Sequence, residues 1–163
     1  MRWEIVTTAS GNEVYHLFKQ DKKLLSLSYN PFSNSARVEC DKEKRVFLIG
    51  TEGIRRPKTV LLNEYGVKIG ELGHEDEEDF IDVNNERFYY AFQNNPLAEL
   101  ILYKESKNKP LVVCSLKANE GNTSVEFRKD KSLPTSSHPG LLMALCWYMF
   151  LPVAKENIVE YAS

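Results

Sequence analysis

Short runs of apolar residues alternate with turn-forming residues through most of the chain. The runs are rich in valine, isoleucine, leucine and aromatic residues, whereas glycine, proline, asparagine and aspartate gather between them. Such a pattern is typical of an antiparallel sheet, in which tight turns connect successive strands. It predicts twelve strands, at about residues 3–8, 13–19, 24–29, 35–40, 45–50, 59–62, 67–72, 80–83, 87–92, 99–103, 110–116 and 123–128.

The pattern changes near the C-terminal end, where residues 141–151 are all apolar or aromatic. A helix of this composition has no polar face, so it must be enclosed by protein or lie in lipid. Ser137 or His138 is a suitable cap, Pro139 suits the first turn, and Pro152 is expected to end or kink the helix. The residues expected in the core, on a helix over about 138–151, are Leu141, Leu142, Leu145, Trp147 and Phe150.

The length of the apolar run favours a buried helix over a membrane anchor. A transmembrane helix needs about 20 apolar residues, and this run is several residues too short, so no transmembrane segment is expected. Closing the twelve strands into a barrel would enclose the helix and protect the sheet edges. The sequence therefore predicts an α+β, mostly β fold: a closed antiparallel barrel of about twelve strands, over residues 2–128, around a hydrophobic C-terminal helix, with a tail over 152–163.

Composition and charge narrow the class of protein further. A chain of 163 residues with 42% hydrophobic content fits a single domain, residues 1–163. The net charge of −2 provides no overall basic excess, so nucleic acid is not an expected partner. The first residues lack the apolar run of a signal peptide, which predicts a cytoplasmic protein. Three cysteines form no C-x-x-C pair and are interpreted as structural thiols.

Successive hairpins that end in one hydrophobic helix resemble the tubby C-terminal-like superfamily, which includes the LURP-one-related and phospholipid-scramblase-like proteins. Residues 60–72 look like the family's strand, turn and strand, with Gly66 and Gly70 in a G-x-x-x-G spacing, and residues 99–103 look like a later strand. The resemblance implies a barrel around a central helix and, in some branches, binding of phosphoinositides or other membrane lipids. No basic residue of the family's headgroup site is carried over to this chain.

The strongest candidate for a binding site is a basic loop. Arg55, Arg56 and Lys58 surround Pro57, and two guanidinium groups with one ammonium can bind a phosphate. A solvated loop without a ligand is the alternative. The sequence predicts this loop as an anion-binding site.

Other polar clusters carry weaker signals. The acidic run 75–79 lacks the alternating ligand spacing and central glycine of a calcium loop, so no metal site is predicted. The histidines at positions 16, 74 and 138 are dispersed without a nucleophile motif, so no catalytic residue is predicted. The aromatic run 88–92 alternates between two faces of a strand, which favours a core role over stacking on nucleobases.

Together these observations predict a non-catalytic binding or scaffold domain without a cofactor. Its expected partner is another protein or a lipid headgroup. One alternative is a peripheral domain that binds phosphoinositides or other anionic lipids through Arg55, Arg56 and Lys58. A second alternative is a hollow, lipocalin-like carrier of a small molecule, which would need an empty barrel interior.

Overall fold

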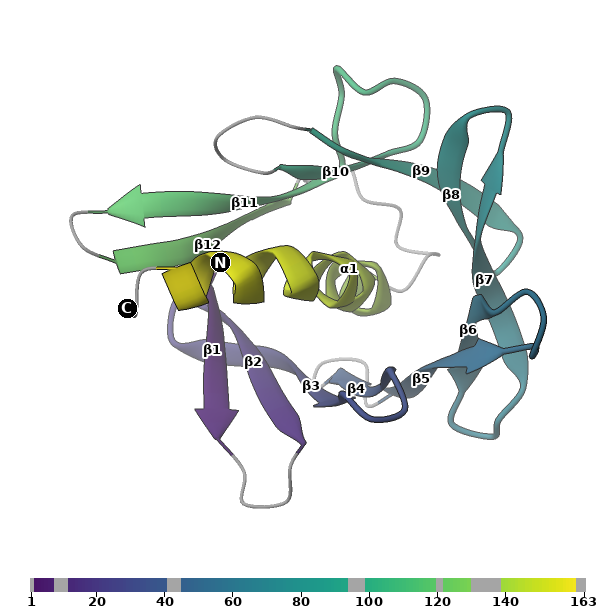
Figure 1. Ribbon diagram of the computed structural model, residues 1–163, viewed down its shortest axis with the longest axis horizontal. Coiled ribbons are helices and arrows are strands. Elements are labelled where there is room, and N and C mark those ends of the chain that lie inside the picture. The colour runs from purple at the N-terminus through teal and green to yellow at the C-terminus, as the bar shows by residue number, and fades with distance from the viewer. Residues whose placement is uncertain are drawn as a thin grey trace.

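The computed structural model describes residues 2–7, 12–40, 45–93, 99–119, 122–129 and 139–160. These residues form twelve strands and one C-terminal helix (Figure 1). The strands are β1 (Arg2–Thr7), β2 (Glu13–Lys19), β3 (Lys22–Asn30), β4 (Ser35–Cys40), β5 (Arg45–Glu52), β6 (Lys58–Asn63), β7 (Lys68–Glu75), β8 (Glu78–Val83), β9 (Glu86–Phe92), β10 (Leu100–Tyr103), β11 (Val112–Asn119) and β12 (Asn122–Lys129), and the helix is α1 (Pro139–Glu160).

The strands follow one another in an antiparallel sheet that curls around the helix. Each strand pairs with its neighbours in the chain, over three to eight residue pairs per interface. The first and last strands also meet, but β1 pairs with β12 at a single position, Arg2 opposite Glu126. The junction between these two strands is therefore much shorter than any other in the sheet.

Short turns set the register of several hairpins. The β2–β3, β7–β8 and β8–β9 turns each place two consecutive residues at positive φ, and aspartate or asparagine occurs in every pair. These residue types tolerate the left-handed conformation that two-residue hairpin turns require. Gly66 in the β6–β7 turn has a φ of +74°, as its place in the sequence predicts.

In strands β2 to β5, alternate residues point into the curled sheet and form part of its apolar lining. Leu25 and Leu27 of β3 are completely buried, whereas the intervening Ser26 is only half-buried. This alternation follows from the two-residue repeat of a strand. Further lining residues that are completely buried are Leu17, Val38, Phe47, Leu61, Ile81, Val83, Phe88, Leu100, Leu102 and Cys114.

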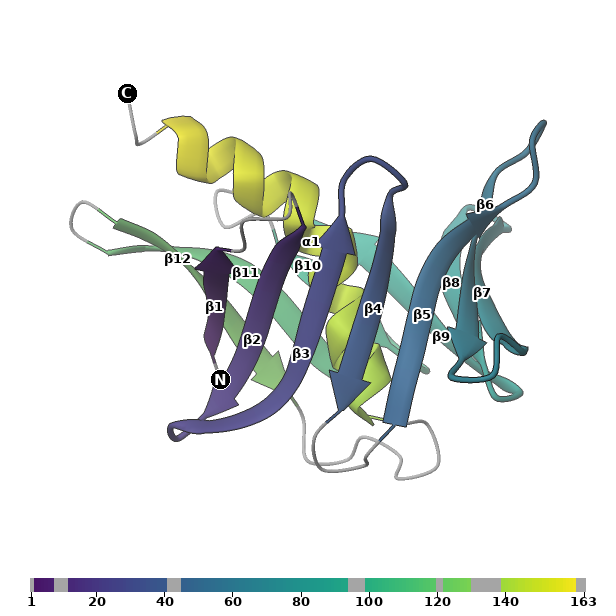
Figure 2. The same ribbon diagram turned by 90° about the horizontal axis from the view of Figure 1, so that it is seen from below.

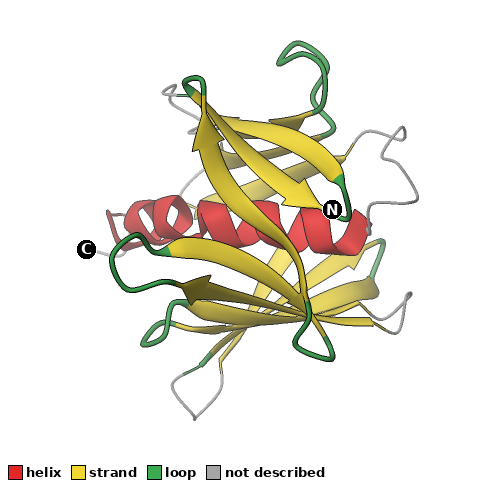
Figure 3. Cartoon of the chain, turned by 90° about the vertical axis from the view of Figure 1, so that its right-hand side faces the viewer, coloured by secondary structure: helices red, strands yellow, loops and turns green. Residues whose placement is uncertain are grey.

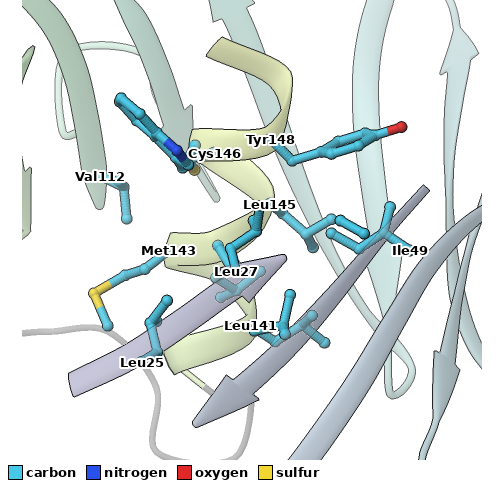
Figure 4. Packing of buried hydrophobic residues seen from close by; sticks show 14 of the residues in the cluster. Leu25, Leu27, Ile49, Val112, Leu141, Met143, Leu145, Cys146 and Tyr148 are labelled. Carbon is cyan, nitrogen blue, oxygen red and sulfur yellow. The ribbon is translucent and has the colours of Figure 1, made fainter. Parts of the chain in front are cut away.

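Helix α1 packs against this lining on several sides. Figure 3 shows the helix running between strands, and Figure 4 places Leu145 beside Leu27 and Ile49 while Val112 lies across the helix. The five helix residues expected in the core are all buried: Leu141, Leu142, Leu145, Trp147 and Phe150.

Aromatic contacts attach the helix to the first two strands. The rings of Trp147 and Trp3 stack with centroids 4.9 Å apart, and Tyr15 meets Trp147 edge-on at 5.5 Å. Because Trp3 belongs to β1, this contact holds the first strand of the sheet to the last element of the chain. Aromatic pairs of this kind contribute about 0.5–1.5 kcal/mol beyond the area they bury.

The predicted end of the helix is wrong. Pro152 was expected to end or kink it and to leave residues 152–163 as a tail. The helix does not end there, because α1 continues through this position to Glu160; a kink at Pro152 is compatible with this continuation. A proline inside a helix removes one backbone hydrogen bond and crowds the carbonyl four residues earlier. The burial of most residues of 141–151, on the preceding turns, outweighs this local cost.

Replacing Leu145 tests whether the helix is enclosed. Leu145→Ala should lower the free energy of unfolding by about 2–5 kcal/mol, because it leaves a cavity in the core. Leu145→Asp should prevent cooperative folding, since an unpaired carboxylate would be buried among apolar side chains. Chemical denaturation measures both effects.

Val67→Asp is the matched control, because Val67 lies in the exposed β6–β7 turn. It should change the free energy of unfolding by less than about 0.5 kcal/mol. Melting of Leu145→Asp at the wild-type temperature would show that Leu145 contacts water.

Candidate functional site

One end of the sheet carries the residues with the clearest binding potential. Because strand direction alternates, the β3–β4 turn, the β5–β6 loop and the β7–β8 turn all lie at this end. Figure 2 shows the first two projecting in the same direction. The helix reaches the same end, where the Tyr148 hydroxyl donates a hydrogen bond to the Asn34 carbonyl at 2.9 Å. We call this end the loop end.

The β5–β6 loop, residues 53–57, is exposed along its whole length. Gly53 has a φ of +91°, and a Cβ there would lie 3.0 Å from the Arg56 carbonyl oxygen, so a tight turn requires glycine. Ile54 follows and is completely exposed. Arg55 and Arg56 have no ion-pair partner among the described residues, so both guanidinium groups are available to an anion.

Lys58 does not share this freedom. Its Nζ lies 3.6 Å from Glu71 Oε1, and Lys68 Nζ lies 2.8 Å from the other oxygen of Glu71 and 3.5 Å from Glu52. The hydrogen bond between Lys68 and Glu71 raises the pKa of the ammonium and lowers that of the carboxyl group. Lys58 thus belongs to an ion-pair network at the base of the loop, whereas Arg55 and Arg56 have no ion-pair partner among the described residues.

The β3–β4 turn presents a second apolar tip. Phe32 is 93% exposed, although the turn that carries it is well fixed. The Asn30 side-chain oxygen accepts hydrogen bonds from the backbone N–H groups of Phe32 and Ser33, at 2.9 and 3.3 Å. The Tyr29 hydroxyl reaches the Asn34 side chain at 3.1 Å. These hydrogen bonds fix the turn, which leaves the aromatic ring of Phe32 exposed to water.

A cleft of about 370 Å³ opens at the loop end, between the helix and strands β3, β6 and β7. Its walls are mostly apolar, with hydroxyl and amide groups among them. The residues that line it are Tyr29, Asn34, Thr59, Leu72, Tyr148, Met149, Leu151 and Pro152. Small-molecule sites in proteins have volumes of about 300–1,000 Å³, and this cleft lies in the lower part of that range.

A second cavity, of about 380 Å³, lies over strands β3 to β6. Arg37 is the charged residue among those that line it, and its guanidinium is bonded to Glu39 at 3.0 Å. The other polar residues that line it are serines and asparagines. The pairing of Arg37 leaves this cavity a weaker anion site than the β5–β6 loop.

Glu75 and Asp79, at the two ends of the acidic run, contact different partners. Arg87 binds Asp82 through two hydrogen bonds and also contacts Glu75, while its guanidinium lies 3.9 Å from the centre of the Phe80 ring. Asp79 bonds His74 at 2.9 Å on the exposed surface. Within the described residues, no group of three or more His, Cys, Asp or Glu side chains is arranged to hold a metal ion.

The cysteines and the aromatic run, which were also considered as reactive or binding residues, are largely buried or packed in the structure. Cys40, Cys114 and Cys146 are buried free thiols, and burial raises the pKa of Cys114 and Cys146, which keeps both groups protonated. In the aromatic run, Phe88 is buried and Tyr89 stacks on Tyr103 at 5.8 Å. The histidine at position 138 lies outside the described residues.

The comparisons with known proteins place the chain in no family. No family model matches it, and no curated protein or solved structure matches it significantly. In the part of the chain that the structure describes, no helix is long and apolar enough to cross a membrane.

Sequence reasoning selected Arg55, Arg56 and Lys58 but missed two other residues of the loop end. Phe32 and Ile54 are apolar residues within turn segments, where no alternating pattern places them toward a core. Both residues follow a proline or a glycine and precede a polar residue, and this context could have indicated that they lie exposed in turns. The cleft had no signal in the sequence, because its walls come from four separate elements.

Tyr148→Phe tests the bond that joins the helix to the β3–β4 turn. Losing the hydrogen bond to Asn34 should lower the free energy of unfolding by about 0.5–1.5 kcal/mol near neutral pH. Burial raises the pKa of Tyr148 to about 12, from an ordinary value near 10. At pH values between these two pKa values, the Tyr148 hydroxyl is deprotonated in the unfolded chain but stays protonated in the folded chain. The contribution of Tyr148 to the free energy of unfolding therefore falls as pH rises.

The difference in stability between wild type and Tyr148→Phe should therefore narrow between pH 8 and pH 11, as measured by urea unfolding. Tyr90 and Tyr103 also have a pKa raised to about 12, so both proteins should lose stability over this range. A difference that stays constant with pH would contradict the assignment to Tyr148.

Proposed function

We propose that this chain is a non-catalytic binding domain that docks by its loop end onto an anionic lipid surface. The observation that carries the proposal is that exposed apolar side chains and exposed arginines occur together on the loops of this end. Phe32 and Ile54 project into water on two adjacent loops, and Arg55 and Arg56 follow Ile54 directly. Single exposed apolar residues are ordinary. Two at one end, beside arginines without an ion-pair partner among the described residues, match the requirements of a membrane interface.

The energetics support a reversible association. Each arginine near an anionic membrane contributes about 1 kcal/mol, and each large apolar side chain that leaves water contributes about 1.5–3 kcal/mol. The acidic β7–β8 turn lies at the same end, and its repulsion favours contact through the β3–β4 and β5–β6 loops. Lys58 stabilises the base of the loop in this proposal, through Glu71, and does not bind the headgroup itself.

The fold that presents these loops is, in our proposal, a closed barrel of the tubby C-terminal-like kind. Pairing of Arg2 with Glu126 supports closure, as does the stacking of Trp3 on Trp147 beside the same junction. The hollow-carrier alternative is less well supported, because helix side chains occupy the space inside the sheet. A single cytoplasmic domain without a cofactor remains the expectation for the chain as a whole.

Vesicle sedimentation tests the proposal. The wild-type protein should sediment with phosphatidylcholine vesicles that contain phosphatidylserine or a phosphoinositide, and much less with phosphatidylcholine alone. Arg55→Ala/Arg56→Ala should weaken binding to the anionic vesicles by about 30-fold, since two arginine contributions are lost. Higher salt should weaken wild-type binding.

Lys19→Ala/Lys22→Ala is the matched control, because it removes two exposed positive charges from the opposite end of the sheet. It should bind anionic vesicles nearly as well as wild type. Equal sedimentation with neutral and anionic vesicles, or equal losses in the two double variants, would overturn the proposal.

A further inference from the structure

The cleft at the loop end has the composition of a site for an apolar chain. Leu72, Met149, Leu151 and Pro152 supply aliphatic walls from β7 and from the helix. Among the described residues that line the cleft, none carries a charge. An ion would therefore gain no partner inside it, whereas a hydrocarbon chain would leave water at little polar cost.

The polar groups of the cleft are mostly occupied by one another. The hydroxyl groups of Tyr29 and Tyr148 both donate to Asn34, and the two rings meet edge-on at 6.0 Å. They form a fixed wall whose ring surfaces are available for contact. Thr59 differs, because its hydroxyl makes no hydrogen bond to a described residue. It can donate to an ester carbonyl or a phosphate oxygen at the mouth.

The positive charge needed for a headgroup lies outside the cleft, on the β5–β6 loop. Thr59, near the start of β6, lines the cleft. The loop with Arg55 and Arg56 directly precedes this strand. Apolar cleft walls, together with two arginines on the preceding loop that have no ion-pair partner among the described residues, match an amphiphile with one chain and an anionic head.

We propose that the cleft takes one acyl or alkyl chain of a lipid whose phosphate is bound by Arg55 and Arg56. The proposal rests on the proposed function and adds a specific ligand class to it. The domain then holds a single lipid at the membrane surface, with Phe32 and Ile54 in the interface around it. The volume of about 370 Å³ suits one chain of moderate length and excludes a folded peptide or a second helix.

Titration with alkyl phosphates separates the chain from the headgroup. Butyl, octyl and dodecyl phosphate carry the same anion, and calorimetry below the concentration of micelle formation measures their affinities. Each methylene that enters the cleft should raise the affinity about fourfold until the cleft is filled. The stoichiometry should be one ligand per chain. Affinity that is independent of chain length would show binding of the headgroup alone and overturn the proposal.

Thr59→Phe fills the mouth of the cleft and should weaken binding of dodecyl phosphate by at least about tenfold. Ser26→Phe is the matched control, because Ser26 lies on the outer face of β3, between the two buried leucines. It should bind dodecyl phosphate as wild type does. Wild-type affinity in a folded Thr59→Phe variant would contradict the cleft as the site.

Photo-crosslinking tests the location of the bound alkyl chain in the wild-type protein, without a substitution. Dodecyl phosphate with a diazirine at the end of its chain should label Leu72, Met149 or Leu151, as mapped by mass spectrometry of peptides. Labels confined to the outer face would overturn the proposal.

The vesicle assay and the alkyl phosphate assay can fail separately. Binding of dodecyl phosphate without vesicle binding would refute membrane docking and leave the cleft site intact. Vesicle binding that Thr59→Phe leaves unchanged, together with crosslinks outside the cleft, would refute the cleft site and leave docking intact.

Discussion

The structure depends on one constraint, which is that helix α1 has no polar face between residues 141 and 151. Such a helix is stable in water only if protein surrounds it. The curled sheet meets this need by turning one alternating set of side chains inward along its strands, from Leu17 in β2 to Cys114 in β11. Strands and helix therefore stabilise each other, and the helix, last in the chain, completes the core that the strands begin.

This mutual dependence also separates the structural residues from those available for binding. The most distinctive side chains of the sequence, including Trp147 and the three cysteines, are buried in the core. The surfaces left for binding are the turns and loops, which carry little of the packing, and the cleft between α1 and the strands. At the loop end these turns hold Phe32, Ile54 and two arginines that have no ion-pair partner in the described part of the chain. The helix and strands β3, β6 and β7 provide a cleft at the same end. The core thus presents short connections at its loop end.

Much of the fold was predictable because it follows from local periodicity. The twelve strands and the burial of Leu141, Leu142, Leu145, Trp147 and Phe150 need only the repeats of a strand and a helix. The continuation of α1 past Pro152 was missed, because tertiary packing outweighs the local effect of a proline. The arginines of the candidate site were visible in sequence, but the pairing of Lys58 with Glu71 was not, since Glu71 lies on another strand.

Native-state hydrogen exchange tests the central claim of an enclosed helix most directly. If the sheet surrounds α1, the backbone amides of residues 142–150 should exchange only when the whole protein unfolds, with the same free energy as the central amides of β3 and β11. The dependence of that free energy on denaturant should match global unfolding. Exchange of the helix amides by a smaller opening, while the strands stay protected, would show that the helix leaves the sheet independently and would contradict the account.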